Sequence, residues 1–312
     1  MENCENIILF DWFTGRSCFD SVNDIIELLG MCDPSISWEY REAYMNGYPF
    51  RQSFVGIHIL YGGSDEMGVC LTMSGQGCRS FESYGHGDWA GLLAHFLEPD
   101  ANITRLDLAF DDHTGLLPLD QILDDTIDHC YVSKSRFWQV VQGSTGTTIY
   151  HGSPQSKIRF RIYDKALERG LLDGSHWVRL EMQLRDENAV SMVKEILTDY
   201  DVSRCFLGVL RNYLTYRVPN SDTNRSRWPI AEYWQRLIDG VAIVRLWSSP
   251  GVDYNVFRLQ RFLVDQCGAG ILTWNDLFGI EDLLNQIKLK KPKIAPKYQK
   301  LLAERGALFE TG

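Results

Sequence analysis

The chain has 312 residues, of which 45% are hydrophobic and 23% charged, and these proportions are those of an ordinary folded protein. They exclude a collagen-like rod, a wholly disordered chain and a small disulfide scaffold, and no apolar run approaches the roughly 20 residues that span a bilayer. With 31 basic and 41 acidic residues the formal net charge is −10, which argues against a protein that coats nucleic acid with its whole surface. A local basic groove on an acidic body is compatible with this charge.

The N-terminus has two acidic residues and no basic segment before its apolar stretch, which is not the pattern of a signal peptide. Eight cysteines are scattered without a C-x-x-C pair, as is typical of reduced thiols rather than of disulfides or a zinc site. We therefore expect a cytoplasmic protein that does not contact a membrane.

The first two hundred residues alternate between strand and helix patterns joined by short turns. The first set is a strand, a helix after Ser21, two strands, a turn and a helix, at 7–13, 22–29, 54–61, 69–73, 74–78 and 88–97. The second set is a strand, a helix, four strands and a helix from Asp186, at 103–110, 119–127, 137–142, 147–150, 157–165, 177–185 and 186–197.

This order predicts an α+β fold of mostly antiparallel sheets with helices on one face. Because the order of strands and helices occurs twice, we expect two similar α/β halves, residues 1–98 and 99–218, within a core of residues 1–218. Residues 219–312 are expected to be a mainly helical C-terminal region that ends in a basic tail.

Three strand patterns combine an apolar face with a face of chemically active side chains. In each one alternate residues are apolar, so the residues between them point to the other side of the sheet. The polar residues of the first strand are Arg105, Asp107 and Asp111; those of the second are Arg179, Glu181, Gln183 and Arg185; those of the third are Arg159, Arg161, Tyr163 and Lys165.

Each strand alone could simply be half exposed to solvent, but together the three faces suit phosphoryl transfer. Carboxylates hold a divalent cation through oxygen ligands, and arginines neutralise charge on phosphoryl oxygens. Tyr163 is a candidate nucleophile if nearby cations such as Lys165 favour its phenolate. A packed, hydrogen-bonded tyrosine is the structural alternative at this position.

Other catalytic patterns are absent from the sequence. It has no G-x-x-x-x-G-K-[ST] motif, so a P-loop ATPase is not expected, and no His-x-His pair for a histidine metal site. Any metal would depend on carboxylates, which favours Mg²⁺ or Mn²⁺. We interpret His58 as structural, whereas His151 is a candidate for a phosphate contact.

An ordered set of six short motifs resembles the Rep_trans family of replication initiation factors, which includes rolling-circle initiators of plasmids and phages and related relaxases of mobile elements. The resemblance covers roughly residues 7–215. The motifs are Asp11-Trp12-Phe13, residues 73–78, residues 104–112, residues 150–153 with Ser156, residues 161–165 and Arg179-Leu180-Glu181.

The resemblance implies an endonuclease and strand transferase that nicks and religates one strand of origin DNA. A tyrosine becomes linked to the 5′-phosphate and leaves a free 3′-OH, with help from Mg²⁺ or Mn²⁺. Residues 1–218 would be the nicking core. The expected partners are origin DNA, single-stranded or cruciform, a second copy of the chain in a homodimer, and a host helicase and polymerase.

Carried over by motif, Tyr163 is the expected nucleophile, with Arg161 and Lys165 contacting phosphate or stabilising the phenolate. Asp107 and Glu181 are the expected metal ligands. The remaining assignments are Asp111 as a further metal ligand, Tyr150 as the fallback nucleophile, and Arg159, Arg179, Lys290, Lys291 and Lys293 as DNA contacts, the lysines within the basic stretch 288–305.

Three alternatives remain open at this point. The same chemistry could serve a relaxase that starts conjugative transfer, or the fold could belong to a catalytically silent DNA-binding regulator. A third alternative is metal-dependent hydrolysis by water, which predicts that Tyr163→Phe keeps its activity.

Overall fold

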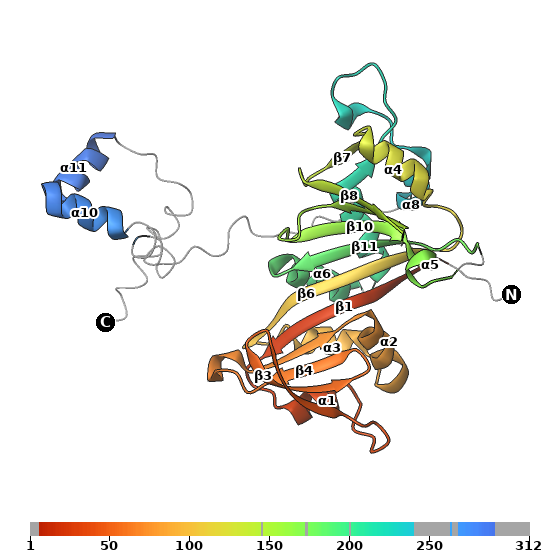
Figure 1. Ribbon diagram of the computed structural model, residues 1–312, viewed down its shortest axis with the longest axis horizontal. Helices are drawn as coiled ribbons and strands as arrows, with labels where there is room; N and C mark the ends of the chain where they lie inside the picture. The colour runs from red at the N-terminus through yellow and green to blue at the C-terminus, as the bar shows by residue number, and fades with distance from the viewer. Residues whose placement is uncertain are drawn as a thin grey trace. The chain divides into compact units, whose positions relative to one another are not determined.

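The computed structural model describes residues 6–144, 146–171, 174–199, 201–239, 263 and 268–290. The chain divides into two compact units, Met1–Trp247 and Ser248–Gly312. The larger unit is built on a ten-stranded sheet in which every neighbouring pair is antiparallel, so the predicted α+β class is confirmed (Figure 1).

The strands of this sheet lie in the order β2-β3-β4-β5-β1-β6-β11-β10-β9-β8. Their bounds are β1 Ile7–Ser17, β2 Glu39–Met45, β3 Tyr48–Phe54, β4 Ile57–Tyr61, β5 Val69–Met73, β6 Ala101–Asp112, β8 Trp138–Gly143, β9 Gly146–His151, β10 Ile158–Asp164 and β11 Val178–Arg185. A separate two-stranded sheet pairs β7 (Tyr131–Ser133) with β12 (Leu214–Tyr216).

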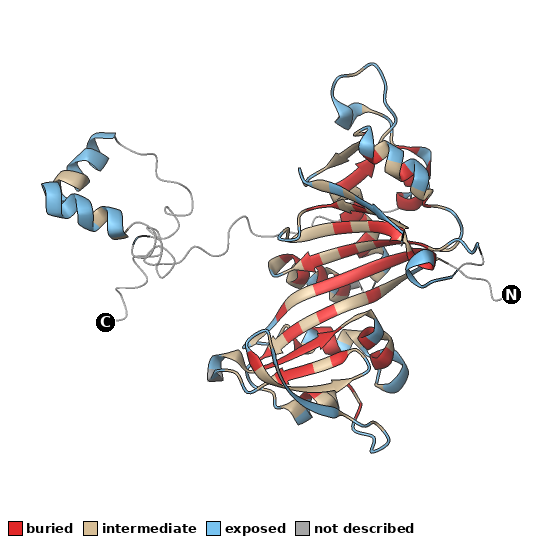
Figure 2. Ribbon diagram, viewed as in Figure 1, coloured by how far each residue is buried: buried red, intermediate tan, exposed pale blue. Residues whose placement is uncertain are grey.

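The helices of the larger unit are α1 Val22–Leu28, α2 Gly75–Tyr84, α3 Trp89–His95, α4 Leu119–Ile127, α5 Lys165–Glu168, α6 Glu187–Asp199, α7 Val202–Tyr213 and α8 Glu232–Ile238. Short 3-10 turns lie at Asp65–Met67 and Arg225–Arg227. The apolar sides of α2 and α6 pack on the central strands and share one core with them, which forms the red interior of Figure 2. Figure 1 looks onto the opposite, open face of the sheet, with α3 and α6 behind the strands.

The two ends of the sheet have the same strand order about the central pair β1 and β6. On one side β1 is followed outward by β5, β4, β3 and β2, and on the other side β6 is followed by β11, β10, β9 and β8. In each half the first strand in sequence is the central one, and a helix follows it, as the repeated sequence pattern predicted. The boundaries at 98/99 and 218/219 stay predictions.

Alternation within the strands builds both faces. Leu106, Leu108 and Phe110 of β6 are buried in the core, and so are Leu180 and Met182 of β11. Their polar neighbours therefore line the open face. This alternation fixes the register, because a shift by one residue would exchange the two faces.

Two local predictions were wrong. Residues 54–61 form the end of β3 and the whole of β4, separated by a tight turn in which Val55 and Gly56 have φ of 29° and 83°. The segment expected to be a turn at 74–78 starts helix α2, with the Ser74 side chain accepting a hydrogen bond from the Gly77 N–H. Gly77 is required by packing, since a Cβ there would lie 2.3 Å from the Gly56 carbonyl oxygen.

The smaller unit contains α10 (Gly268–Phe278) and α11 (Ile280–Lys290), in line with the predicted helical C-terminal region. Within the described part of the chain, no helix has both the length and the apolar character needed to cross a membrane.

Candidate active site

Four neighbouring strands of the C-terminal half, β6, β11, β10 and β9, bring the predicted site residues onto one face. Glu181 of β11 lies directly opposite Arg161 of β10, which in turn lies opposite Tyr150 of β9. Two residues along β11 from Glu181, Gln183 lies opposite Asp107 of β6. These facing positions follow from regular antiparallel pairing. The side chains that meet on this face therefore come from four separate segments of the sequence.

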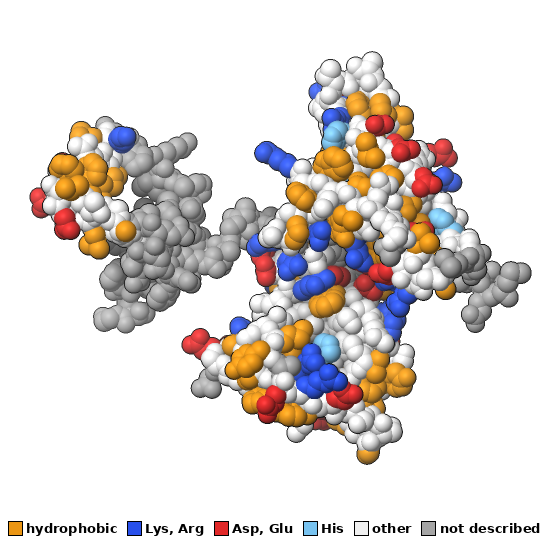
Figure 3. All heavy atoms as spheres, in the orientation of Figure 1, with side chains coloured by type: hydrophobic (Ala, Val, Ile, Leu, Met, Phe, Trp, Pro, Cys, Tyr) orange, Lys and Arg blue, Asp and Glu red, His pale blue; other side chains and the backbone are white. Residues whose placement is uncertain are grey.

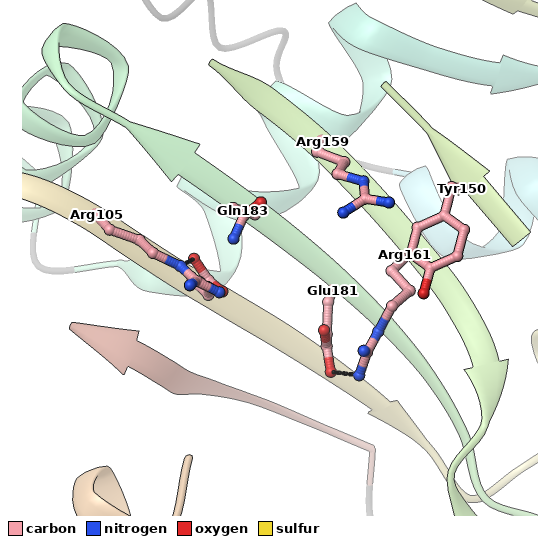
Figure 4. A pocket seen from close by; sticks show the side chains of 7 residues that line it. Arg105, Tyr150, Arg159, Arg161, Glu181 and Gln183 are labelled. Atoms are coloured by element: carbon pink, nitrogen blue, oxygen red, sulfur yellow. Dashed lines mark hydrogen bonds and ion pairs between the residues drawn. The ribbon is translucent and has the colours of Figure 1, made fainter. Parts of the chain in front are cut away.

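Side chains of these four strands line a small polar pocket of about 110 Å³ (Figure 4). Two carboxylates and three guanidinium groups are among the groups that meet in it, so it combines groups suited to a cation with groups suited to a phosphate. The lining residues are Arg105, Asp107, Tyr150, Arg159, Arg161, Glu181 and Gln183.

Tyr163 lies beside the pocket and is almost completely buried. Its hydroxyl donates a hydrogen bond of 2.6 Å to Glu181 Oε1, which also accepts a bond of 2.9 Å from Arg161 Nη2. The Arg161 guanidinium carbon lies 4.1 Å from the centre of the phenol ring. Lys165 Nζ donates to the phenol oxygen at 3.2 Å and also contacts Glu168.

Burial is the main cause that raises the pKa of Tyr163 above its ordinary value, and the Glu181 charge adds to it. Arg161 and Arg179 act in the opposite direction but do not outweigh it. The neighbouring arginines therefore favour the phenolate, but burial and Glu181 outweigh them, and the Tyr163 hydroxyl donates its hydrogen bond to Glu181. Burial likewise raises the pKa of Glu181, which suits that carboxylate to accept a proton.

Asp107 is buried and is held by Arg105, whose Nε and Nη2 donate to its two oxygens at 2.9 and 2.5 Å. Burial raises the pKa of Asp107 to about 6, against the effect of Arg105. The charges of Glu181 and Asp11 add to the increase, so these three carboxylates act on one another electrostatically.

Asp111 and Arg179 lie apart from the pocket lining and form a buried ion pair. Arg179 donates through Nε and Nη2 to both Asp111 oxygens at 2.6 and 2.7 Å, and through Nη1 to Asp11 at 2.8 Å. Arg179 thus joins β11 to β6 and β1. Both oxygens of Asp111 and the guanidinium of Arg179 are engaged in these contacts, and their expected roles as metal ligand and DNA contact stay predictions.

The pocket's carboxylates fit a hard divalent cation in kind, because Asp107 and Glu181 supply oxygen ligands next to one another in a buried setting where neighbouring acids raise each other's pKa. Among the described residues there is no ready cluster of three or more Asp, Glu, His or Cys side chains. A cation here would be held by these two carboxylates, together with water or DNA oxygens.

Sequence reasoning gave Asp11 no role, although it stands in the first of the six motifs. A β-bulge between Phe10 and Trp12 shifts the pairing of β1 with β6 at this residue. Simple alternation therefore does not reveal that its carboxylate approaches Arg179. The charge coupling to Asp107 and Glu181 is visible only in three dimensions.

The other predicted residues fall in three places. Tyr150 and Arg159 line the pocket, with the Arg159 guanidinium 4.1 Å from the centre of the Tyr150 ring. Lys290 is exposed at the end of α11 in the smaller unit, and Lys291 and Lys293 lie outside the described residues. His151 does not contact the pocket: it is buried, and its Nε2 lies 2.8 Å from the Tyr216 hydroxyl.

An antiparallel sheet whose open face joins carboxylates, arginines and tyrosines defines the class as a phosphoryl-transfer protein of α+β fold. Comparison with known proteins identifies the family. The model of the replication initiation factor family matches residues 101–287, and that of the rolling-circle replication initiation protein N-terminal domain matches residues 8–94. The chain belongs to this family of rolling-circle replication initiators and relaxases.

Individual relatives agree with this assignment. The chain is 26% identical over 266 residues to the putative DNA relaxase NicK of Bacillus subtilis (strain 168), covering 79% of this chain and 75% of that protein. It is similar to the solved rolling-circle replication initiator protein of Geobacillus stearothermophilus, with 28% identity and a TM-score of 0.70. That similarity covers 78% of this chain and 100% of the solved one.

Proposed function

We propose that the chain starts rolling-circle replication by nicking one strand of its origin DNA through a covalent link between Tyr163 and the 5′-phosphate. The observation that supports this most is the hydrogen-bonded set of Tyr163, Glu181, Arg161 and Lys165 beside a pocket of carboxylates and arginines. It contains a nucleophile, a base and cations for phosphate oxygens within contact of one another.

In the proposed reaction the Tyr163 oxygen attacks the phosphorus atom and the bond from phosphorus to the 3′-oxygen breaks. The phenol proton passes to Glu181 along the 2.6 Å hydrogen bond, and the departing 3′-oxygen takes a proton from water. Lys165 stabilises the phenolate as it forms, while Arg161 neutralises charge on the phosphoryl oxygens. Religation is the reverse, with a 3′-OH attacking the phosphotyrosine.

A divalent cation, Mg²⁺ or Mn²⁺, would be held by Asp107 and Glu181, with Asp11 or Asp111 as a further candidate ligand. When bound, it would polarise the scissile phosphate and stabilise the leaving oxygen. Arg105 would then hold Asp107 in place through its two hydrogen bonds.

Tyr150 is the second candidate nucleophile, because it lines the pocket directly whereas Tyr163 is buried beside it. Attack by Tyr163 requires the phosphate to enter between Arg161 and Glu181. Attack by Tyr150 requires no such entry, but among the described residues no hydrogen bond joins its hydroxyl to a base.

The test is to incubate the purified chain with labelled single-stranded DNA carrying its own origin and Mn²⁺ or Mg²⁺, and to look for a covalent adduct on a denaturing gel. We expect a metal-dependent adduct that Tyr163→Phe removes and Tyr150→Phe retains. The opposite pattern transfers the role to Tyr150. Cleavage without adduct supports hydrolysis by water, and binding without cleavage supports a silent regulator.

The remaining partner assignments extend the same proposal. Arg159, Arg179 and the lysines Lys290, Lys291 and Lys293 are proposed DNA contacts, of which Arg159 is best placed because it lines the pocket. A homodimer and contacts with a host helicase and polymerase follow from the family resemblance. A relaxase role is distinguished by whether the nicked strand belongs to a transfer origin or a replication origin.

A further inference from the structure

A row of polar side chains crosses the open face from the pocket into the N-terminal half. Thr14 of β1 lies opposite both Arg105 of β6 and Thr72 of β5. Thr72 lies opposite His58 of β4, and His58 lies opposite Ser53 of β3. Because Arg105 lines the pocket, the row begins at the candidate active site. Its four strand spacings span roughly 19 Å.

Hydrogen bonds fix the side chains along this row. The Trp12 indole N–H donates to Thr14 Oγ1 at 2.9 Å, and Thr14 donates to Thr72 Oγ1 at 3.5 Å. Ser53 Oγ and His58 Nδ1 lie 2.9 Å apart. The Arg105 guanidinium carbon lies 4.1 Å from the centre of a Trp12 ring, so the start of the row combines a cation with an aromatic surface.

Positive charge continues along the same face. Arg51, two residues before Ser53 on β3, contacts the Met45 sulfur through its side chain, and its buried Nε has no partner among the described residues. The Nε atoms of Arg159 and Arg185 are likewise unpartnered within the described chain. Among the described residues, Arg51, Arg159 and Arg185 form no ion pair. By contrast, Arg105, Arg161 and Arg179 each pair with a carboxylate. Lys and Arg side chains gather over the middle of this face in Figure 3.

The N-terminal strands occupy places equivalent to the catalytic strands but carry different groups. Strands β1, β5, β4 and β3 correspond in sheet order to β6, β11, β10 and β9. In place of buried carboxylates and tyrosines, the half-buried positions offer the hydroxyls of Thr14 and Ser53, the His58 imidazole and the Arg51 guanidinium, with the buried Thr72 supporting Thr14. Such groups donate to phosphate oxygens without providing a nucleophile, and aromatic or guanidinium planes stack on bases.

We propose that this row is a track for single-stranded DNA, which holds several nucleotides on one side of the scissile phosphate irrespective of their sequence. The inference rests on the proposed function, because the strand must continue from the pocket at Arg105. Acidic groups do not interrupt the row itself. At the sheet edge Glu39 lies opposite Ser53 and is neutralised by Arg41 at 2.9 Å.

The test measures the anisotropy of fluorescein-labelled dT16 bound to the full chain at low salt without divalent cations. Arg51→Glu should raise the dissociation constant at least roughly 10-fold and reduce the salt dependence, because a phosphate contact is lost. Lys194→Glu is the matched control, since it makes the same charge change on an exposed position of α6, on the helical side of the sheet. Lys194→Glu should change the dissociation constant of dT16 less than roughly twofold.

Equal affinities for the two variants, or no binding of dT16 by the wild type, would overturn the track. Thermal unfolding checks that Arg51→Glu folds. As a measurement on the wild type, dT16 containing 5-iododeoxyuridine should cross-link on irradiation to peptides containing Trp12 or His58. Cross-links confined to the C-terminal half would also overturn it. Nicking of origin DNA, measured in parallel, judges the proposed function separately from the track.

Discussion

The two halves of the ten-stranded sheet repeat one strand order and differ in the chemistry of their open faces. The C-terminal half places Asp107, Glu181 and Tyr163 together, with burial raising the pKa of each. The N-terminal half places Thr14, Thr72 and His58 along its open-face row. On the proposed roles, one scaffold serves catalysis in one half and DNA binding in the other, according to which polar side chains its alternating positions carry.

The largest expected effect comes from removing the proposed base of the catalytic half. Glu181→Gln should lower the nicking rate by roughly 10²- to 10⁴-fold, because the Tyr163 proton loses its acceptor. Binding of dT16 should change little. Glu98→Gln, at an exposed position after α3 in the other half, is the control and should nick like the wild type. A Glu181→Gln variant with full nicking activity would remove Glu181 from the mechanism.

The next effect concerns the metal. Removing divalent cations with EDTA should abolish nicking, and Asp107→Asn should raise the Mn²⁺ concentration for half-maximal nicking at least roughly 10-fold. Asp120→Asn, at an exposed position in α4, should leave it unchanged. The independent readout is the rise in melting temperature on adding Mn²⁺, which Asp107→Asn should diminish. An unchanged Mn²⁺ requirement in Asp107→Asn would contradict the ligand assignment.

A buried histidine of the C-terminal half should make the free energy of unfolding depend on pH. Burial lowers the pKa of His151 to about 3, whereas in the unfolded chain it is about 6.5. Between these values the unfolded state binds the extra proton, so this group makes the protein less stable as pH falls below about 6.5, at ~1.4 kcal/mol per pH unit.

Urea unfolding at pH 7.5 and 5.0 measures this dependence. The wild type should lose about 2 kcal/mol more than His151→Gln between these pH values, because the variant does not titrate. The same loss in both proteins would show that His151 is not held neutral in the folded state.

The smallest effect is confined to the N-terminal half. Ser21 forms a capping box with Asp24 at the start of α1, and Ser21→Ala should cost about 1 kcal/mol of unfolding free energy. Nicking should stay at the wild-type rate, since α1 packs behind the sheet. Thermal unfolding and the nicking assay together check this. A loss of nicking at a temperature where the variant is folded would refute the separation of the two faces.

The sequence predicted most of the catalytic half because its strands alternate cleanly. Residues 103–110 lie within β6, and the open faces of β6, β10 and β11 carry the residues expected there. The strands β2 and β3 were missed, since residues 39–54 mix charged and aromatic side chains without strict alternation. Glycines at 75 and 77 indicated a turn, although Gly77 serves the close approach of α2 to Gly56.

Pairing between side chains limits what alternation can predict about the site. Alternation placed Asp111 on the correct strand but could not show that Arg179 engages both of its oxygens. It could not place Asp11, because a bulge displaces the register of β1 at that point. Nor could it show that Tyr163 is buried against Glu181 while Tyr150 lines the pocket, since both depend on how neighbouring strands meet.

In the proposed mechanism Tyr163 of the C-terminal half carries the 5′-phosphate. The most direct measurement is to digest the covalent adduct formed with origin DNA and Mn²⁺ and to identify by mass spectrometry the tyrosine that carries the nucleotide. We predict the nucleotide on the peptide containing Tyr163. A nucleotide on Tyr150, or on any residue of the N-terminal half, would rule out Tyr163 as the nucleophile.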